Sequence, residues 1–280
     1  MKKHLPTVLL ALAFLVGLSL LLYPTISDSV NSLHQTKAIT GYTAGVSDLS
    51  KEKHDKLWQE AVAYNTQLAK KANQWALSEP GLQQYRNTLR LDNSAVMGYI
   101  EIPKLGCTLP IYHDVDDGTL QTSIGHVPGT SLPVGGASTH CVLSGHRGLP
   151  SAKLFSDLDR LAVGDQFTLH TLDALLLYEV DQILIVLPHE SDALQIEEGK
   201  DYCTLVTCTP YGVNSHRLLV RGHRVSDADA AAPVHVPADA MQIEPRIVAF
   251  FAAILFLLIL LLCTLISKPR KKQSREDKPV

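Results

Sequence analysis

Three residues whose side chains suit acyl transfer stand at the ends of predicted strands: Cys208, His146 and Arg217. Cys208 follows the apolar run 202–207 and precedes the turn 209–212, so its thiol can lie at an accessible strand end. Arg217 begins the next predicted strand, and a hairpin-like pairing of the two strands can return it beside Cys208. His146 lies in a glycine-flanked turn after another strand. We therefore expect the three side chains to meet at one site.

This combination of side chains suits nucleophilic acyl transfer. A thiolate at Cys208 can attack a carbonyl carbon, and an imidazolium at His146 can protonate the amine that leaves. The guanidinium of Arg217 can stabilise the oxyanion or hold the substrate backbone. Two cationic neighbours also favour the thiolate form of a cysteine, which is the nucleophilic form.

Other roles for the cysteines stay open at this level. The chain has five of them, an odd number that leaves at least one thiol unpaired: Cys107, Cys141, Cys203, Cys208 and Cys263. An unpaired thiol is unusual outside the cell and favours catalysis, with structural cysteines and a zinc site as the alternatives. A zinc site would use His140, Cys141, His146, Cys203, Cys208 and His216. Against it, Cys203 and Cys208 point to opposite faces of an unbroken strand, and no C-x2–4-C pair exists.

From Val96 onward, the apolar pattern is that of strands: short aliphatic or β-branched runs between turns rich in Gly, Pro and Asp. The predicted strands are 96–102, 109–112, 141–143, 166–170, 175–186, 202–207 and 218–225. The segment 154–161 is the one clear short helix candidate in this region. So many short strands with so little helix predict a compact β-barrel or sandwich.

A helix is predicted before this region, over 51–77. Its apolar stripe consists of Leu57, Ala61, Tyr64, Leu68, Ala72 and Trp75, and we expect it to pack on the protein's own domain. Asp48 or Ser50 is the expected N-cap, and Pro80-Gly81 the expected stop. The polar stretch 24–47 is interpreted as a stalk.

Two apolar segments, 5–23 and 247–266, lie near the ends of the chain. The second is uncharged, long enough for a transmembrane helix, and followed by a basic run, which the positive-inside rule places in the cytoplasm. The first follows Lys2 and Lys3. We expect it to be an uncleaved anchor because no convincing small-x-small cleavage site follows it; a cleaved signal peptide is the alternative.

The distribution of charge supports the same topology. The chain holds 25 Lys+Arg and 28 Asp+Glu, a net charge of −3. Residues 1–7 carry +2 and residues 267–280 carry +4, which leaves −9 for residues 8–266. An acidic middle has the wrong sign for nucleic-acid binding, and its apolar content is too high for a disordered chain. We therefore expect both basic ends inside the cell and the acidic domain outside.

Two of these motifs resemble those of a known family. The strand Thr204-Leu-Val-Thr-Cys208 is similar to the Thr-Leu-x-Thr-Cys signature of sortases, and Arg217 stands where that family has its catalytic arginine. The turn Leu143-Ser-Gly-His146-Arg-Gly-Leu-Pro150 resembles the family's histidine turn. Together with the runs 96–103 and 109–112, these motifs look most like class C, the pilus-building sortases.

This resemblance implies an eight-stranded sortase β-barrel with an N-terminal helical region, flanked by two transmembrane helices. It also implies a cysteine transpeptidase, without cofactor or metal, that cleaves a Leu-Pro-x-Thr-Gly-like sorting signal between Thr and Gly. Cys208 becomes the nucleophile that forms a thioester, His146 the general acid and then base, and Arg217 the oxyanion and substrate anchor. Leu205 and Thr207 are expected to line the substrate groove or to support it.

Class C enzymes usually carry a lid with an Asp-Pro-aromatic motif over the catalytic Cys and Arg. Here Glu79-Pro80 resembles Asp-Pro, but Gly81 is not aromatic, so Trp75 and Leu82 are the candidates for the plug. A degenerate lid and an ordinary connecting loop are both compatible with this stretch.

The expected function is to join the acyl group of a sorting signal to a lysine of a pilin subunit, with the membrane as a further partner and no nucleic acid. A housekeeping sortase that attaches surface proteins to the cell wall precursor is an alternative, and a non-catalytic membrane-tethered assembly or binding module is another. The predicted parts are an N-terminal signal or anchor (1–23), a stalk, helical region and candidate lid (24–95), the catalytic barrel (96–226), a linker (227–246), a transmembrane helix (247–266) and a cytoplasmic tail (267–280).

Overall fold

The computed structural model of the protein describes residues 5–91, 95–225 and 254. Apart from residue 254, three predicted parts of the chain lie outside the described residues: the linker, the second membrane segment and the basic tail (227–246, 247–266 and 267–280). The chain divides into two units, one of Met1–Leu20 with Ala232–Val280 and one of Leu21–Ala231. The second unit contains Cys208, His146 and Arg217.

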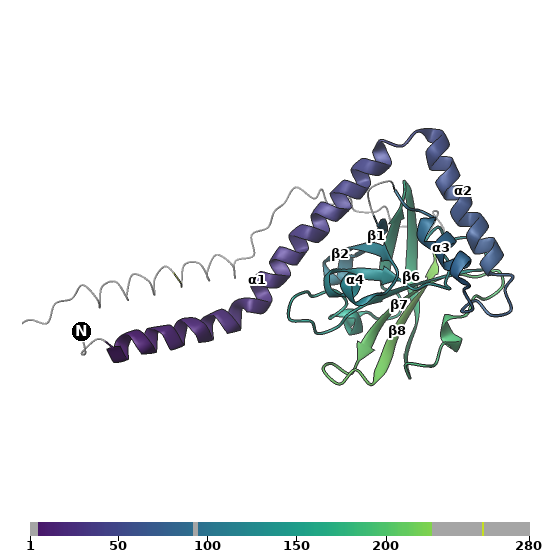
Figure 1. The fold of residues 1–280 in the computed structure, drawn as a ribbon. Helices are drawn as coiled ribbons and strands as arrows, with labels where there is room; N and C mark the ends of the chain where they lie inside the picture. The colour runs from purple at the N-terminus through teal and green to yellow at the C-terminus, as the bar shows by residue number, and fades with distance from the viewer. Residues whose placement is uncertain (1–4, 92–94, 226–253, 255–280) are drawn as a thin grey trace, which may run out of the picture. The chain divides into compact units, whose positions relative to one another are not determined.

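Eight strands of this unit close into a barrel in the order β1-β2-β3-β4-β7-β8-β6-β5 (Figure 1). They are β1 (Val96–Ile102), β2 (Cys107–His113), β3 (Ile124–His126), β4 (Thr139–Gly145), β5 (Gln166–Thr171), β6 (Ala174–Val186), β7 (Asp201–Thr209) and β8 (His216–Arg224). The predicted barrel is therefore confirmed. The sequence pattern misses β3, because a strand of three residues is too short to show alternation.

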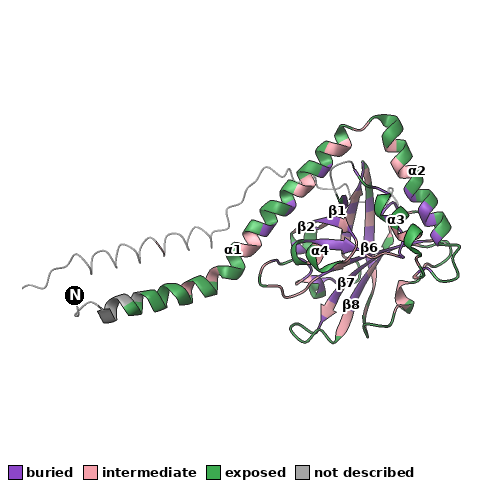
Figure 2. Ribbon diagram, viewed as in Figure 1, coloured by how far each residue is buried: buried purple, intermediate pink, exposed green. Residues whose placement is uncertain are grey.

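The inner and outer faces of the barrel differ in burial along β7. Cys203 and Leu205 are fully buried in the core, and Thr207 is nearly so, whereas Val206 and Cys208 are half-buried on the outer face. Figure 2 shows the same concentration of buried residues on the strands and of exposed residues on the helices. The alternation of side chains along a strand therefore presents Cys208 to the outside of the barrel.

The helix predicted over 154–161 is wrong: only the 3-10 turn η2 (Leu158–Arg160) forms there. Leu154 has a φ of 38°, outside the right-handed helical region, while Phe155 and Leu158 are buried in the core. The apolar spacing in this segment thus belongs to an irregular turn. The remaining short elements are η1 (Pro103–Leu105), α4 (Asp117–Thr122) and η3 (Asp192–Leu194).

The first helix, α1 (Leu5–Ser47), includes the first predicted membrane segment. Within the described residues, one helix is long and apolar enough to cross a membrane by length and composition, Leu12–Ser47. This stretch lies near the N-terminus, as expected for an anchor or a signal sequence.

The stretch 24–47 is not the expected stalk, because it continues α1 as a helix and packs on the barrel. The amides of Asn31 and Gln35 both donate to the carbonyl of Thr122, at 2.9 and 2.7 Å. The buried Tyr42 donates its hydroxyl proton to a carbonyl of β1 at 3.0 Å. Burial raises the pKa of Tyr42, so the phenol stays neutral and remains a donor. These contacts make the second half of α1 part of the folded domain.

The helix predicted over 51–77 is shorter in the structure: α2 spans Lys51–Leu68. Ser50 caps it, as expected, by accepting a hydrogen bond from the backbone of Lys53. The predicted stop at Pro80-Gly81 is wrong, because these residues begin another helix, α3 (Glu79–Asn87), which Ser78 caps. Proline is tolerated in the first helical turn, where its missing N–H has no intrahelical partner to lose.

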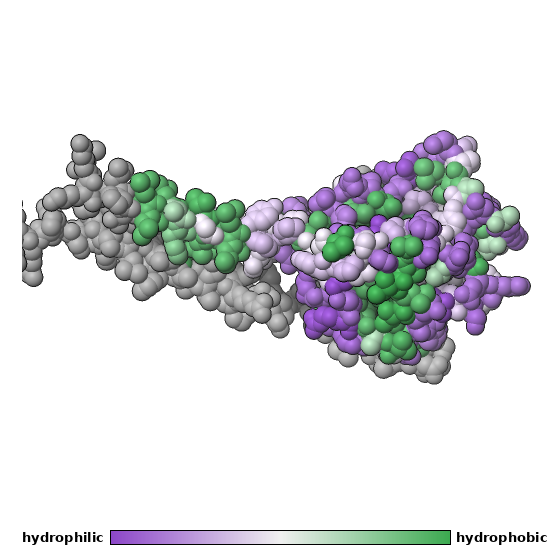
Figure 3. Space-filling model, turned by 90° about the horizontal axis from the view of Figure 1, so that it is seen from below, coloured by the Kyte–Doolittle hydropathy of each residue, from purple (hydrophilic) through white to green (hydrophobic). Residues whose placement is uncertain are grey.

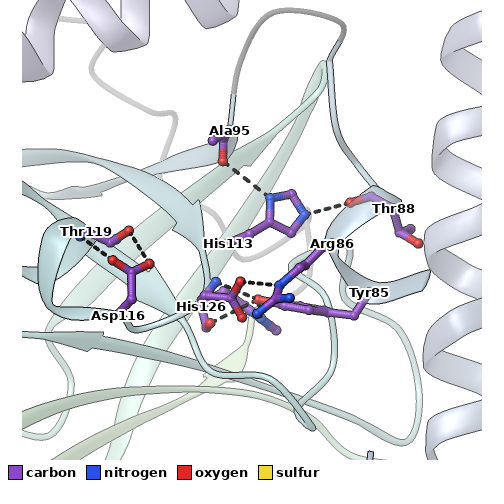
Figure 4. Close-up of polar contacts among 9 residues, drawn as sticks. Tyr85, Arg86, Thr88, Ala95, His113, Asp116, Thr119 and His126 are labelled. Carbon is purple, nitrogen blue, oxygen red and sulfur yellow. Dashed lines mark hydrogen bonds and ion pairs between the residues drawn. The ribbon is translucent and has the colours of Figure 1, made fainter. Parts of the chain in front are cut away.

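A network of polar contacts fastens α3 to the edge of the barrel (Figure 4). The fully buried Tyr85 accepts a hydrogen bond from the backbone of Asp114 at 3.1 Å and donates to the carbonyl of His126 at 3.0 Å. Arg86 pairs with the carboxylate of Asp114 at 2.7 Å. A ring nitrogen of His113 lies 2.8 Å from the carbonyl that ends α3. Contacts on both flanks of the helix thus hold it against β2 and β3.

Candidate active site

Cys208 and Arg217 face each other across the antiparallel pair β7 and β8, where they are direct register partners. Residues opposite each other in such a pair project from the same face of the sheet. Both side chains are half-buried, on the outer face of the barrel. The hairpin that the sequence predicts therefore brings the thiol and the guanidinium together.

His146 comes to the same place from the other side of β7. Strands β4 and β7 are parallel, with Ser144 level with Val206. The hydroxyl of Thr207 donates to the carbonyl of Gly145 at 2.8 Å, which carries this register one residue further. His146 is thus level with Cys208 one residue after the end of β4. Because β7 lies between β4 and β8 in the barrel, histidine, cysteine and arginine form one row across three neighbouring strands.

The guanidinium of Arg217 is held by backbone carbonyls. Its Nη1 donates to the carbonyl oxygens of Asn214 and His216, at 3.2 and 3.1 Å. In the described part of the chain, no carboxylate lies within ion-pair distance of it. An arginine oriented by neutral acceptors keeps its full positive charge available for an anionic group beside Cys208.

We call the row of His146, Cys208 and Arg217 the candidate catalytic row. An apolar row lies next to it on the same outer face. Val206 on β7 pairs with Leu219 on β8, and Leu219 pairs with Leu184 on β6. Figure 3 shows a strip of apolar surface and several smaller apolar patches on one face of the folded domain. In the β7–β8 turn, Tyr211 and Val213 are exposed, and Leu187 is exposed just after β6. The surface around the thiol can therefore receive apolar side chains.

Leu205 and Thr207, predicted as groove or supporting residues, are both buried. Leu205 lies in the core, and the side chain of Thr207 is occupied by its hydrogen bond to the β4 carbonyl. Both therefore support the strands beneath the site and do not line a groove.

The four lid candidates have partners of their own in the structure. A Cβ added to Gly129 would lie 3.4 Å from the ring of Trp75, so the indole packs against the connection between β3 and β4. Glu79 and Pro80 form the first turn of α3, and Leu82 packs partly buried against the core. In the described part of the chain, these four residues have no recorded hydrogen bond or ion pair with the catalytic row.

The residue before Trp75, which the sequence pattern does not single out, makes the strongest contact of this segment. Gln74 is buried, donates to the carbonyl of Leu194 at 3.3 Å and accepts from the backbone of Ile196 at 3.1 Å. Both partners belong to the connection between β6 and β7. That connection starts after Val186, the register partner of Arg217. The segment before α3 thus holds a loop that begins at the catalytic row.

The inner cysteines are separate from the site. Cys141 and Cys203 are register partners on β4 and β7. Both are buried free thiols that are not joined by a disulfide. Burial raises the pKa of Cys203 strongly. In Cys141, burial is outweighed by hydrogen bonds with Cys203 and His126, which lower its pKa. Of this coupled pair, Cys141 is therefore the thiol that ionises first.

The zinc alternative finds no cluster of ligands. His140 lies on the outer face, 2.7 Å from the hydroxyl of Thr204 and 2.8 Å from the carbonyl of Gln195, whereas Cys141 and Cys203 point inward. Across the residues that the structure describes, no group of three His, Cys, Asp or Glu side chains is placed to hold a metal ion. His140 instead fastens the β6–β7 connection to the sheet.

Comparison with known proteins agrees with this geometry. The family model of the Sortase domain matches residues 100–225, which run from within β1 to just past β8. Sortase C1 from Streptococcus agalactiae is 50% identical in sequence with a TM-score of 0.67, and the match covers 68% of this chain and 99% of that chain. Sortase C from Streptococcus pneumoniae is 43% identical with a TM-score of 0.62, covering 68% and 97%.

A third structure, sortase C from Clostridium perfringens with a C-terminal cell wall sorting motif, is 42% identical with a TM-score of 0.60, covering 68% of this chain and 99% of that one. All three similarities extend over nearly the full length of the solved chains. The barrel, the strand-end cysteine and these matches lead to one conclusion: the chain belongs to the sortase family of cysteine transpeptidases, in which it is similar to class C.

Proposed function

We propose that this chain is a membrane-anchored sortase that cleaves sorting signals through a thioester on Cys208 and transfers the acyl group to a lysine amine of a pilin subunit. The observation that carries the proposal is the single row formed by His146, just after β4, with Cys208 on β7 and Arg217 on β8. A thiol between an imidazole and a free guanidinium is the arrangement that acyl transfer through a thioester requires.

In the first half-reaction, the Cys208 thiolate attacks the carbonyl carbon of the Thr in the signal. The guanidinium of Arg217 stabilises the oxyanion that forms. As the Thr–Gly bond breaks, the imidazolium of His146 gives its proton to the departing Gly nitrogen. The products are a thioester on Cys208, a free Gly amine and a neutral imidazole.

In the second half-reaction, a lysine amine attacks the thioester carbon. Neutral His146 takes a proton from the attacking nitrogen, and Arg217 again stabilises the oxyanion. Collapse of this intermediate forms an isopeptide bond and releases the Cys208 thiolate. The enzyme thereby returns to its starting protonation state, with no external oxidant, metal or cofactor in either half.

The proposed substrate class rests on the site and on the relatives. The half-buried Val206 and Leu184, which flank the buried Leu219 beside the row of His146, Cys208 and Arg217, suit the Leu and Pro of a Leu-Pro-x-Thr-Gly-like signal. The similar C. perfringens enzyme was solved with a cell wall sorting motif, and the S. pneumoniae enzyme was described in terms of pilin substrate specificity. Both support a sorting signal as donor, and the second supports a pilin as acceptor.

The proposed location is the cell membrane, with the barrel on the outer face. The apolar first half of α1 supports the N-terminal anchor. The segment 247–266, apolar and followed by a basic tail, is proposed as a second span on sequence alone. Two anchors would keep Cys208 near the membrane, where secreted substrates emerge.

The segment from Gln74 to Leu82 is proposed to be a connector that holds the β6–β7 loop, not a lid over the thiol. The two hydrogen bonds of Gln74 to that loop and the packing of Trp75 on Gly129 support the connector. Glu79 and Pro80 serve α3 in this assignment.

The test is mass spectrometry of the purified full-length chain with a peptide that carries a Leu-Pro-x-Thr-Gly signal. We expect a mass increase on Cys208 equal to the acyl fragment, and none in Cys208→Ala. Cys107→Ala is the matched control, because this half-buried thiol lies outside the catalytic row and should leave acylation unchanged. Signal cleavage that persists in Cys208→Ala would refute the assignment.

The acceptor separates the pilin enzyme from the housekeeping alternative. The acylated chain is offered either a lysine-containing pilin domain or an amine of the wall peptide, and the release of Cys208 is followed for each. Faster release by the pilin lysine is expected. Faster release by the wall amine would instead assign the housekeeping role. If no signal peptide acylates Cys208, the chain is better described as the non-catalytic membrane-tethered module.

A further inference from the structure

The residue that follows the proposed general acid contacts the turn that follows the nucleophile. The side chain of Arg147 is 11% exposed, and its guanidinium is contacted from three directions. Nη2 pairs with the carboxylate of Asp159 on η2, and Nη1 lies 3.5 Å from the hydroxyl of Thr209, which follows Cys208. The guanidinium also lies over the ring of Tyr211, 5.9 Å from its centroid.

The two turns are in direct contact as well. Gly148 has a φ of 77°, and a Cβ added to it would lie 2.9 Å from the ring of Tyr211. The backbone N–H of Gly148 donates to the hydroxyl of Ser156 at 3.0 Å, which holds the far side of the same turn. A glycine is required here both by the backbone conformation and by the ring above it. The histidine turn therefore packs beneath the β7–β8 turn.

We propose that Arg147 is a positioning residue, which fixes His146 relative to Cys208 by fastening the histidine turn to the cysteine turn. His146 lies beyond the last register pair of β4 and β7, Ser144 with Val206, so the strand ladder alone does not fix its side chain. Arg147 supplies the missing constraint. This inference rests on the proposed roles of His146 and Cys208.

The bonding of Arg147 argues against a purely structural role. Its Nε is buried and has no hydrogen-bond partner among the described residues. An unsatisfied buried donor costs stability, and an apolar side chain of similar size would avoid that cost. Arginine is nevertheless the residue that reaches Asp159, Thr209 and Tyr211 at once, because its planar fork donates in several fixed directions.

The chemical reason for such a constraint is the sensitivity of proton transfer to distance. His146 must deliver a proton to the leaving nitrogen while that nitrogen is bound to the carbon held by Cys208. A displacement of about 1 Å in such a site lowers the rate about a hundredfold. Arg147 touches neither the thiol nor the bond that breaks, so its effect passes through His146.

The experiment compares Arg147→Ala, Arg147→Lys and Asp159→Asn in the full-length chain, with acylation by a sorting-signal peptide and the pH profile of acylation as readouts. We expect Arg147→Ala to lower kcat about a hundredfold with KM nearly unchanged, since signal binding does not use this turn. Arg147→Lys retains one charged contact and should recover part of that loss. A shifted or flattened alkaline limb in the pH profile is expected, because the proton donor, which must be protonated to act, is misplaced.

Arg160→Ala is the matched control. Arg160 stands on the same 3-10 turn with an exposed ion pair to Asp157, and its removal should leave kcat and the pH profile unchanged. If Arg147→Ala fails to fold, Asp159→Asn and Arg147→Lys decide the question. Wild-type kcat in these variants, or a loss of kcat that only follows the folded fraction, overturns the inference. The proposed function is tested separately, by acylation of Cys208 in the otherwise unchanged chain, by its loss in Cys208→Ala and by the choice of acceptor, none of which depends on Arg147.

Discussion

Cys141 and Cys203 are register partners on the parallel strands β4 and β7, and five residues later come His146, just past the end of β4, and Cys208, still on β7. An odd separation reverses the face of a strand, so the first pair points into the barrel and the second pair points outward. The exposed fractions of Cys141 and Cys203 are 3% and 0%. One pair of strands thus carries both a core thiol pair and the proposed reactive pair.

Thiol labelling should follow this division. In the native full-length chain, iodoacetamide is expected to modify Cys208 first and to leave Cys141 and Cys203 unmodified until the protein unfolds. Burial raises the pKa of Cys107 to about 12, so this half-buried thiol should react slowly at pH 7. Peptide mapping by mass spectrometry gives the order. Early labelling of Cys141, whose pKa is lowered by hydrogen bonds with Cys203 and His126, would show that the core opens under native conditions.

The row of His146, Cys208 and Arg217 is predictable from the sequence because each of its members lies at or next to the end of a strand. A hairpin is enough to bring Arg217 to Cys208, and the motif around His146 supplies the third member. The contacts of Gln74 and Arg147 are not predictable in this way. They join segments far apart in the chain, and no periodicity marks a side chain whose partners are a distant loop backbone or a neighbouring turn.

The helical region shows a different limit of sequence reasoning. The apolar stripe over 51–77 continues past the end of α2 at Leu68, because Trp75 is also packed, but against a loop and not along a helix. Pro80-Gly81 is typical of a helix stop, yet Ser78 as N-cap makes it the start of α3. The same residues suit either end of a helix, and the capping hydrogen bond decides between them.

Replacing Arg217 should impair the chemical step more than signal binding. Its Nη1 bonds only to backbone carbonyls in the described structure, so Arg217→Ala leaves no buried carboxylate without a partner, and the barrel should keep its stability. We expect kcat to fall by about 10²–10³, the usual effect of losing an oxyanion donor. Steady-state cleavage of a signal peptide measures this. Arg217→Lys is the comparison variant, because it keeps the positive charge but loses the planar guanidinium. Activity equal to wild type in Arg217→Ala would show that Arg217 has no part in the mechanism.

The stability of the barrel should depend on pH through buried histidines. Burial lowers the pKa of His113 and of His140, so both are neutral in the folded protein near pH 7. Since the folded pKa lies below the unfolded value of about 6.5, their stabilisation is complete above that pH and is lost as the pH falls through the folded pKa. Each can contribute at most about 1.4 kcal/mol per pH unit to this decline.

Urea unfolding followed by tryptophan fluorescence at pH 7.5 and 5.5 measures the change in the free energy of unfolding. His113→Asn should lower the stability at pH 7.5 and reduce the difference between the two pH values. His223→Gln is the control, because His223 is exposed and its loss should leave that difference unchanged. A stability that does not fall between pH 7.5 and 5.5 would contradict the prediction.

Removing the two hydrogen bonds of the Gln74 side chain should loosen the β6–β7 connection. Gln74→Ala loses two hydrogen bonds to that loop, and we expect KM for the signal peptide to rise about fivefold, the equivalent of about 1 kcal/mol, with kcat nearly unchanged.

Trp75→Ala should leave the labelling rate of Cys208 within about twofold of wild type, because the indole packs on Gly129 and not over the thiol. Much faster labelling in Trp75→Ala would favour a lid over a connector.

The anchor helix α1 should influence the reaction through Asp28. Its carboxylate accepts a hydrogen bond at 2.6 Å from the backbone N–H of Lys153, in the connection after β4 that begins with His146. Within that connection, the carbonyl of His146 accepts from the backbone of Phe155 at 3.2 Å. Asp28→Ala frees one side of the connection, and we expect kcat to fall about tenfold, the equivalent of ~1.4 kcal/mol. Asp28→Asn keeps an oxygen acceptor and should retain most activity. If both variants match wild type when acylation is measured in vesicles, α1 anchors the enzyme without shaping its site.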